Sequence, residues 1–316
     1  MSAEMIGLWI GFNLAVLALL ALDLGVFNRQ AHEVSLREAA IWSAVWVGLS
    51  LLFNLFIFFW RGTDTGLDFL TAYLIEKSLS VDNIFVFVLI FSAFSVPARY
   101  QHRVLFWGVL GAIVMRGLLI LAGTTLIALF HWLLYVFGAF LILTGIRLAW
   151  RQEQQMHPDK HPLVRLARRF VPVTADFEGP HFFARKEGRL FITPLLLVLL
   201  VVESADLLFA LDSIPAVFAI TLDPFIVYTS NVCAILGLRA LYFLLADLVE
   251  RFHYLKFGLA VILTLVGFKL LLADLYHIPI GISLGAIALV LTAAVIASLL
   301  RPPKKPAREA EKKAPV

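Results

Sequence analysis

The stretch LLLVLLVVESADLLFALDSIPAVFAI, residues 195–220, combines two properties that conflict with each other. It is longer than the roughly 20 apolar residues that an α-helix needs to cross a bilayer. Yet it holds three carboxylates, Glu203, Asp206 and Asp212. Each charged side chain at the centre of a membrane helix costs about 2.5–3.5 kcal/mol on insertion scales, so such acids usually face a partner or a cavity. The stretch therefore predicts a membrane-spanning helix that carries a polar site.

The composition of the whole chain agrees with a membrane location. Of its 316 residues, 61% are hydrophobic and only 15% are charged, against about 45–50% and about 25% in soluble domains. This balance excludes a water-soluble globular protein, a disordered chain and a nucleic-acid binder of ordinary type, because too little charge is present to cover a soluble surface. The single Cys233 excludes a disulfide framework and a thiolate-cluster metal site.

Nine apolar segments are long enough to cross a membrane, and we predict an all-α polytopic protein with about nine transmembrane helices. The transmembrane domain covers residues 1–300, and a disordered basic tail follows at 301–316. The longest connection, 151–190, is basic and rich in proline, with a short surface helix expected around 162–170. The expected spans are 5–27, 39–60, 67–95, 104–127, 131–150, 191–220, 225–247, 254–273 and 279–300.

The distribution of basic residues predicts the orientation of these spans. Of 26 Lys and Arg residues, 20 lie in or beside the segments that follow spans 1, 3, 5 and 7 and in the tail. The other side holds one, Arg61, and the remaining five lie inside spans or at their edges. Because cytoplasmic loops carry the excess of Lys and Arg, we expect the N-terminus outside, the C-terminus inside and the 151–190 loop in the cytoplasm.

Spans 3 to 5 resemble spans 6 to 8, which predicts an inverted repeat of three plus three helices, 67–150 and 191–273. The acids Glu76 and Asp82 of the first copy match Asp206 and Asp212 of the second. Three spans separate the copies, an odd number, so the second copy is inverted in the membrane. Inverted repeats are typical of transporters, whose site lies near the midplane where the copies meet. The alternative is an old duplication that serves packing alone.

The intramembrane acids predict a binding site for a hard divalent cation. Glu76, Ser80 and Asn83 share a helix face, and so do Asp206 and Ser213. Collecting all the acids in one site requires a break in a helix, which we expect at Pro215 because proline frees the carbonyl of Leu211. Oxygen donors without Cys or a suitable His set favour Mn²⁺, Ca²⁺ or Mg²⁺. The candidate ligands are Glu76, Asp82, Asn83, Glu203, Asp206, Asp212 and Ser213.

Three basic residues lie inside the same spans and are candidate counter-charges. Arg116 and Arg239 occupy matched positions in spans 4 and 7, and Lys77 follows Glu76 directly. They can hold the empty site together before a cation binds. The alternative is that the acids and bases only join helices to one another.

The stretches EKSLSVDNIFVF at 76–87 and VESADLLFALDSIPAVFAITLDPFIVYTSNVCAILGLRALYFLL at 202–245 resemble the TerC family of integral membrane proteins. SLLFN at 50–54 and RVLFWGVLGAIVMR at 103–116 extend the similarity, which covers about residues 5–300 and is closest to the Alx-type members. The resemblance implies divalent metal homeostasis, most often Mn²⁺ export across the bacterial cytoplasmic membrane, with a link to tellurite resistance. It also implies that Glu76, Asp82, Glu203, Asp206 and Asp212 are the family's intramembrane acids.

We therefore expect a multi-pass transporter that exports Mn²⁺, with protons as the coupling ion, and neither an enzyme nor a protein with a resident cofactor. Its partners are the divalent ion, the lipid bilayer and protons, and no nucleic acid. One alternative is a Ca²⁺ or Mg²⁺ transporter of the same architecture. Another is a membrane scaffold for metal or tellurite stress that recruits partners through the 151–190 loop. The residues alone support a divalent-cation site in an inverted-repeat membrane protein.

Overall fold

The computed structural model describes residues 3–22, 35–150, 161–186, 189–246, 254–272, 275–276 and 278–300. The predicted disordered tail, 301–316, lies outside the described residues. The described part is helical apart from one small hairpin. Its elements are α1 (Ala3–Leu22), α2 (Leu36–Arg61), α3 (Thr63–Ala93), α4 (Ala98–Leu129), α5 (Leu133–Trp150), α6 (Pro162–Phe170), β1 (Phe183–Lys186), β2 (Arg189–Ile192), α7 (Pro194–Phe218), α8 (Pro224–Leu236), α9 (Leu238–Leu245), α10 (Leu255–Leu271) and α11 (Ile280–Leu300).

The helices follow the predicted apolar ranges, and the prediction of an all-α polytopic protein is confirmed in this coarse form. In the described part, seven segments are long and apolar enough to cross a membrane: α1, α2, α4, α5, α7, α11 and the α8–α9 pair. The two other predicted spans coincide with α3 and α10. Helix α3 has 31 residues but carries several acids and Lys77, and α10 has only 17 described residues.

Two local features differ from the prediction. The 151–190 segment contains the expected helix, α6, but it also leads into the antiparallel β1–β2 hairpin, which we did not predict. The expected break at Pro215 is wrong, because α7 runs through Pro215 and ends only at Phe218. Proline lacks the N–H that would bond the Leu211 carbonyl, but the helical backbone nevertheless continues for the three residues up to Phe218. The interruption instead falls at Gly237, between α8 and α9.

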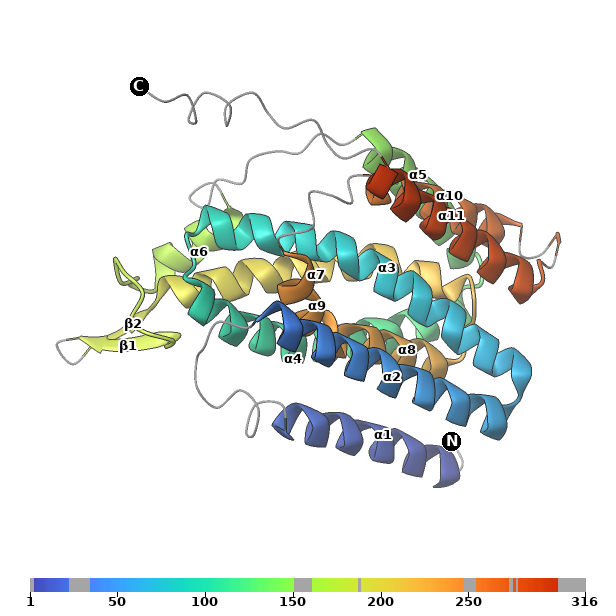
Figure 1. Cartoon of the computed structure of the whole chain (residues 1–316), viewed down its shortest axis with the longest axis horizontal. Helices are drawn as coiled ribbons and strands as arrows, with labels where there is room; N and C mark the ends of the chain where they lie inside the picture. Colours follow the sequence, from blue (N-terminus) through green and yellow to red (C-terminus); the bar gives the residue numbers. More distant parts are fainter. Residues whose placement is uncertain are drawn as a thin grey trace.

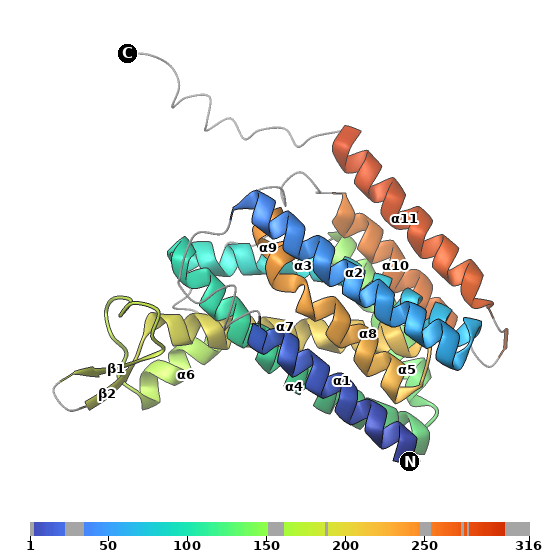
Figure 2. The same cartoon turned by 60° about the horizontal axis from the view of Figure 1, so that its bottom comes forward.

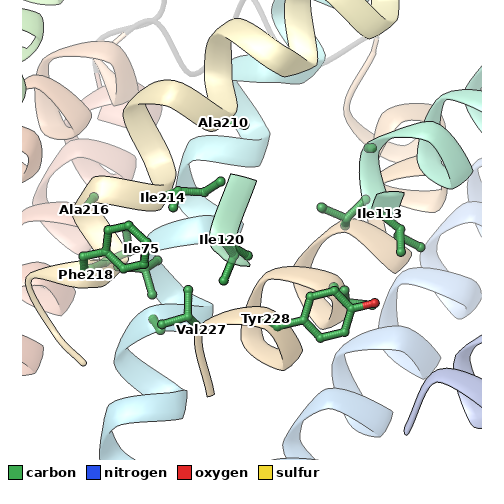
Figure 3. Packing of buried hydrophobic residues seen from close by; sticks show 14 of the residues in the cluster. Ile75, Ile113, Ile120, Ala210, Ile214, Ala216, Phe218, Val227 and Tyr228 are labelled. Atoms are coloured by element: carbon green, nitrogen blue, oxygen red, sulfur yellow. The ribbon is translucent and has the colours of Figure 1, made fainter. Parts of the chain in front are cut away.

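Helices α3, α4, α7 and α8 form the centre of the bundle, and the remaining helices surround them (Figures 1 and 2). Their apolar side chains interlock in one cluster, to which Ile75 of α3, Ile120 of α4, Ile214 of α7 and Val227 of α8 contribute (Figure 3). Helix α5 packs against α10, and α11 lies on the outer side of α10. Any polar side chain that points into this centre is shielded from water.

The sequence also fixes where α8 begins. Asp223 precedes Pro224 and caps the helix, its side chain accepting hydrogen bonds from the backbone N–H of Phe225 at 2.9 Å and of Ile226 at 3.4 Å. Such a cap satisfies N–H groups that would otherwise lack partners at a helix start. The same carboxylate forms an ion pair of 2.5 Å with Arg61 at the end of α2. This contact joins α2 to the α7–α8 turn at one end of the bundle.

Candidate functional site: a buried acid–arginine cluster

Arg116 of α4 is the centre of the candidate site. Its side chain is 1% exposed, and its guanidinium forms ion pairs with Glu76 of α3 and Asp206 of α7. Nη2 donates to Asp206 Oδ1 at 3.0 Å, and Nε donates to Oδ2 at 3.2 Å, so this carboxylate is held by two parallel bonds. Fork-to-fork pairing of this kind is the strongest geometry that Arg and a carboxylate can adopt.

Two neutral side chains complete the hydrogen bonding around Arg116. Asn231 of α8 accepts from Arg116 Nη1 at 2.8 Å through Oδ1 and donates from Nδ2 to Glu76 Oε2 at 3.2 Å. Ser213 of α7 donates to Glu76 Oε1 at 3.3 Å, and its hydroxyl accepts from Arg116 Nη1 at 3.2 Å. We call Glu76, Arg116, Asp206, Ser213 and Asn231 the central cluster. Four helices contribute to it, and all five residues are buried.

The formal charge of the central cluster is negative by one when its ionisable groups are charged, because two carboxylates share one guanidinium. Burying such groups costs several kcal/mol each, and attraction between them repays this cost only when the remaining lone pairs and N–H groups are also bonded. Asn231 and Ser213 supply those bonds. The cluster therefore joins four helices through charged groups whose hydrogen bonding is completed inside the bundle.

Two other predicted acids of α7, Asp212 and Glu203, have described side chains, and Glu203 lies one turn before Asp206, near enough for their charges to interact. Asp212 accepts a hydrogen bond of 3.3 Å from Thr144 of α5. Glu203 points toward Gly111 of α4, where a Cβ would collide with its carboxylate. Its Oε2 is buried and has no hydrogen-bond partner in the described structure. The side chain of Asp82, which we predicted to be a primary ligand, lies outside the described residues.

The remaining predicted residues have different surroundings. Lys77 donates from Nζ to the backbone carbonyl of Ala234 at 3.2 Å. Asn83 is buried in α3. Arg239 of α9 is buried and lines a small cavity together with Asp206. Arg116 is one of the three candidate counter-charges, and it forms the expected ion pairs with intramembrane acids, namely Glu76 and Asp206.

The described side chains do not assemble a metal-binding group of three or more His, Cys, Asp or Glu residues. Glu76 and Asp206 lie on opposite sides of Arg116, with Ser213 and Asn231 beside them. The carboxylate, hydroxyl and amide oxygens are those that a hard divalent cation prefers. The guanidinium takes up the hydrogen-bonding capacity that these oxygens would offer to an ion.

Sequence reasoning missed Asn231. It is fully buried in α8 and bonds to both charged partners, Arg116 and Glu76. Asn231 is an amide at the start of the apolar segment NVCAIL, and this exception to the apolar pattern could have indicated a buried polar contact. The helix-face argument for Ser80 was also incomplete, because its hydroxyl donates to the backbone carbonyl of Glu76 at 2.8 Å.

The fold and the central cluster indicate the class of protein. It is an integral membrane protein of many helices, with ion-paired side chains in its interior. Residues 61–306 match the family model described as "Integral membrane protein TerC family". The chain therefore belongs to the TerC family, and the resemblance seen in the sequence is confirmed.

The chain is also similar to several bacterial membrane proteins. An uncharacterized membrane protein of Myxococcus xanthus is 54% identical over 305 residues, which cover 96% of each chain. A protein of Salmonella typhi is 54% identical over 299 residues, or 92% of each chain. One of Escherichia coli K12 is 53% identical over 290 residues, 89% of this chain and 90% of its own. The last two bear the provisional name membrane-bound redox modulator Alx. No solved structure matches the chain.

Proposed function

We propose that the chain is a transporter that exports a divalent metal cation, with Mn²⁺ as its main substrate, and that it is not an enzyme. One observation carries this proposal. Glu76 and Asp206, acids at matched positions of the two similar segments, meet inside the bundle on one buried guanidinium. Intramembrane acids that face a shared interior position are typical of ion pathways. Membership of the TerC family adds the class of membrane protein.

Arg116 acts in this proposal as a tethered cation. Its guanidinium lies between the two carboxylates and bonds the two neutral oxygens beside them, which is the position that an incoming metal ion would take. A divalent ion adds two positive charges to a cluster whose formal charge is negative by one. Metal binding therefore favours the departure of Arg116 from at least one carboxylate, and release of the metal favours its return.

Asp82 and Asp212 are the proposed primary ligands. Three further carboxylates complete the coordination shell of the ion: Glu76, Asp206 and Glu203. Asn83 and Ser213 directly follow the two primary ligands in the sequence and are additional candidates. Asp212, Asp206 and Ser213 all belong to α7, and Asp82 and Glu76 belong to α3. Gathering them around one ion requires these two helices to shift from the arrangement described above. Movement of helices during transport is the ordinary means by which such sites form and empty.

The proposed topology has nine spans, an inverted repeat, an external N-terminus and a cytoplasmic C-terminus. Helix packing supports the repeat. If α3, α4 and α5 correspond to α7, α8–α9 and α10, then the contact of α3 with α8 has its counterpart in the contact of α4 with α7. The pairs α3–α7 and α5–α10 each map onto themselves. Such a set of contacts is expected of two halves related by a pseudo-twofold axis.

The proposed location is the bacterial cytoplasmic membrane, and the proposed drive is proton exchange. Moving one charge against 100 mV costs about 2.3 kcal/mol, so exporting a divalent ion against that potential costs about twice as much. The sequence has no GxxxxGK[ST] motif for nucleotide hydrolysis. Carboxylates release metal when they bind protons, so a proton gradient can supply the required free energy.

The test is ⁵⁴Mn²⁺ uptake into inside-out vesicles, with and without a pH gradient. The wild-type protein should accumulate the ion, and Asp82→Asn and Asp212→Asn should each reduce the initial rate by at least tenfold. Glu4→Gln, outside the predicted site, is the matched control and should transport normally. If both aspartate variants are folded and transport at the wild-type rate, the site assignment is wrong. Competition by Ca²⁺ and Mg²⁺ in the same assay separates Mn²⁺ export from the alternative substrates.

A scaffold role through the 151–190 loop predicts a different result. Deletion of the loop would then abolish metal tolerance in cells, and Asp212→Asn would leave it intact. The name of the Alx relatives suggests redox chemistry for those proteins. This chain has one cysteine, buried in α8, which cannot form a disulfide within the chain. We favour ion transport because the central cluster consists of charged groups inside the membrane helices, which are typical of ion pathways.

A further inference from the structure

Helix α6 and the β1–β2 hairpin lie together at one end of the bundle (Figures 1 and 2). Val164 is buried and attaches α6 to the end of α7. The opposite half of α6 exposes Leu166 and Phe170, the latter at 74%. These two residues are four positions apart and lie on one side of the helix, and the exposed Arg165 and Arg169 form a neighbouring stripe with the same spacing.

The hairpin presents a second patch of the same character. Arg185 of β1 pairs directly with Leu190 of β2, so their side chains lie on the same face. Phe183 lies two positions before Arg185 and therefore on this face as well. All three side chains are exposed, Leu190 at 58%. We call the two patches together the interfacial surface, made of Arg165, Leu166, Arg169, Phe170, Phe183, Arg185 and Leu190.

The contacts of the hairpin place this surface at the level of the lipid headgroups. The ring of Phe182 lies 6.4 Å from the ring of Trp107 of α4, and Arg103 lies 5.4 Å from the centre of the Phe182 ring. Trp107 and Trp132 are 44% and 58% exposed, and exposed Trp residues mark the edges of the hydrocarbon. From Trp107 to the end of α4 at Leu129 a helix rises about 33 Å, close to the thickness of about 30 Å that a bilayer core has.

We propose that the interfacial surface binds the headgroups of anionic phospholipids. Guanidinium groups pair with phosphate through two parallel hydrogen bonds, and neighbouring apolar side chains can insert among the upper acyl carbons. A soluble protein partner would have to be recruited to this surface, whereas phospholipids occupy that level of the membrane at high concentration. Opposite charge and matching depth together favour lipid as the occupant.

The first test measures the depth of one side chain. Cys233 is the only cysteine, so a Cys233→Ala background accepts a single nitroxide label at Phe170→Cys or, as the matched control, at Ala175→Cys in the nearby exposed segment. The full chain is placed in nanodiscs of phosphatidylcholine with or without 30% phosphatidylglycerol. With the anionic lipid, the label at position 170 should collide with oxygen at least threefold more often, relative to a water-soluble nickel chelate, than the label at 175.

Replacing Arg165 and Arg169 by Gln should remove most of the added immersion that phosphatidylglycerol produces at position 170. Equal exposure to the nickel chelate at positions 170 and 175 would overturn the proposal. Immersion that does not depend on anionic lipid would show that apolar contact alone holds the helix, and this too would overturn it. Exclusion of both collision reagents at position 170 in either lipid would identify a covering protein, such as a second copy of the chain.

A second measurement uses the unmodified protein and does not depend on the folding of any variant. Hydrogen exchange of the amides in 162–170 and 183–192 is followed in the same two kinds of nanodisc. We expect slower exchange in both segments when phosphatidylglycerol is present and unchanged exchange in the buried residues 225–235 of α8. Identical exchange in the two lipid mixtures would contradict the proposal. The result is independent of whether the chain transports Mn²⁺.

Discussion

The two similar segments, 67–150 and 191–273, place their arginines in different backbone settings. Arg116 lies within α4, an uninterrupted helix of 32 residues, and bonds to two carboxylates and two neutral oxygens. Arg239 comes two residues after Gly237, where its segment breaks into α8 and α9, and it lines a small cavity with Asp206. Similar sequences have therefore placed one arginine on a continuous helix, where it bonds Asp206, and the other beside an interruption, where it lines the same cavity as Asp206.

This difference suits a site that must hold charge and also change shape. The backbone of Arg116 is held by a continuous helix, so its guanidinium can leave a carboxylate by rotation of its own side-chain bonds while the helix stays in place. An arginine that follows a helix break can move by rotation of a few backbone bonds. The comparison therefore expects side-chain movement alone at Arg116 and a local backbone adjustment as well at Arg239.

The largest expected effect is that of Arg116→Met. It leaves Glu76 and Asp206 buried without their shared cation, so the free energy of unfolding should fall by about 3–5 kcal/mol. Thermal unfolding in detergent measures the loss. Adding Glu76→Gln and Asp206→Asn to Arg116→Met should restore much of the stability, because no unpaired charge then remains. Arg239→Met should cost less, since Asp206 keeps its bonds to Arg116, and an equal loss would refute the comparison.

Asn231→Leu should have an intermediate effect. It removes an acceptor from Arg116 and a donor from Glu76 within the core, and we expect a loss of about 1–3 kcal/mol. The neighbouring Ser230 is the control, because its hydroxyl donates to the carbonyl of Val227 within the same helix at 3.1 Å and Ser230→Ala leaves the cluster untouched. In a double-mutant cycle, Asn231→Leu and Glu76→Gln should be coupled. Additive effects would exclude Asn231 from the cluster.

The smallest effects are expected at two matched glycines, Gly111 and Gly237. A Cβ at Gly111 would collide with the Glu203 carboxylate, and one at Gly237 would lie 2.8 Å from Nζ of Lys77. The ends of both side chains are flexible, and the Cβ at Gly237 would also lie 3.1 Å from Cβ of Trp46, so we expect each Ala substitution to cost about 1–2 kcal/mol. Gly108→Ala is the control, because its Cβ would meet Val202 at an ordinary 3.4 Å. Slower metal transport by Gly111→Ala than by Gly108→Ala would link Glu203 to the pathway.

The sequence was sufficient for the helices and insufficient for the contacts among them. Apolar length dictates a membrane helix almost alone, which is why the nine predicted ranges coincide with helices or a helix pair. The break was misplaced because Pro215 lies in the last turn of α7, whereas Gly237 has no strong signal in an apolar helix. The pairing of Glu76 with Asp206 depends on how three helices rotate against each other, and helix periodicity within one segment does not determine that rotation.

The packing of α5 against α10 has a mechanical consequence. A Cβ at Gly138 would lie 2.9 Å from the carbonyl oxygen of Gly267, and one at Gly267 would lie 2.7 Å from that of Gly138. The two backbones touch here without an intervening side chain. Most helix contacts can widen gradually, because side chains change rotamer and fill the new space. Where Gly138 faces Gly267 no side chain can fill such a space, so we expect α5 and α10 to move together as one body.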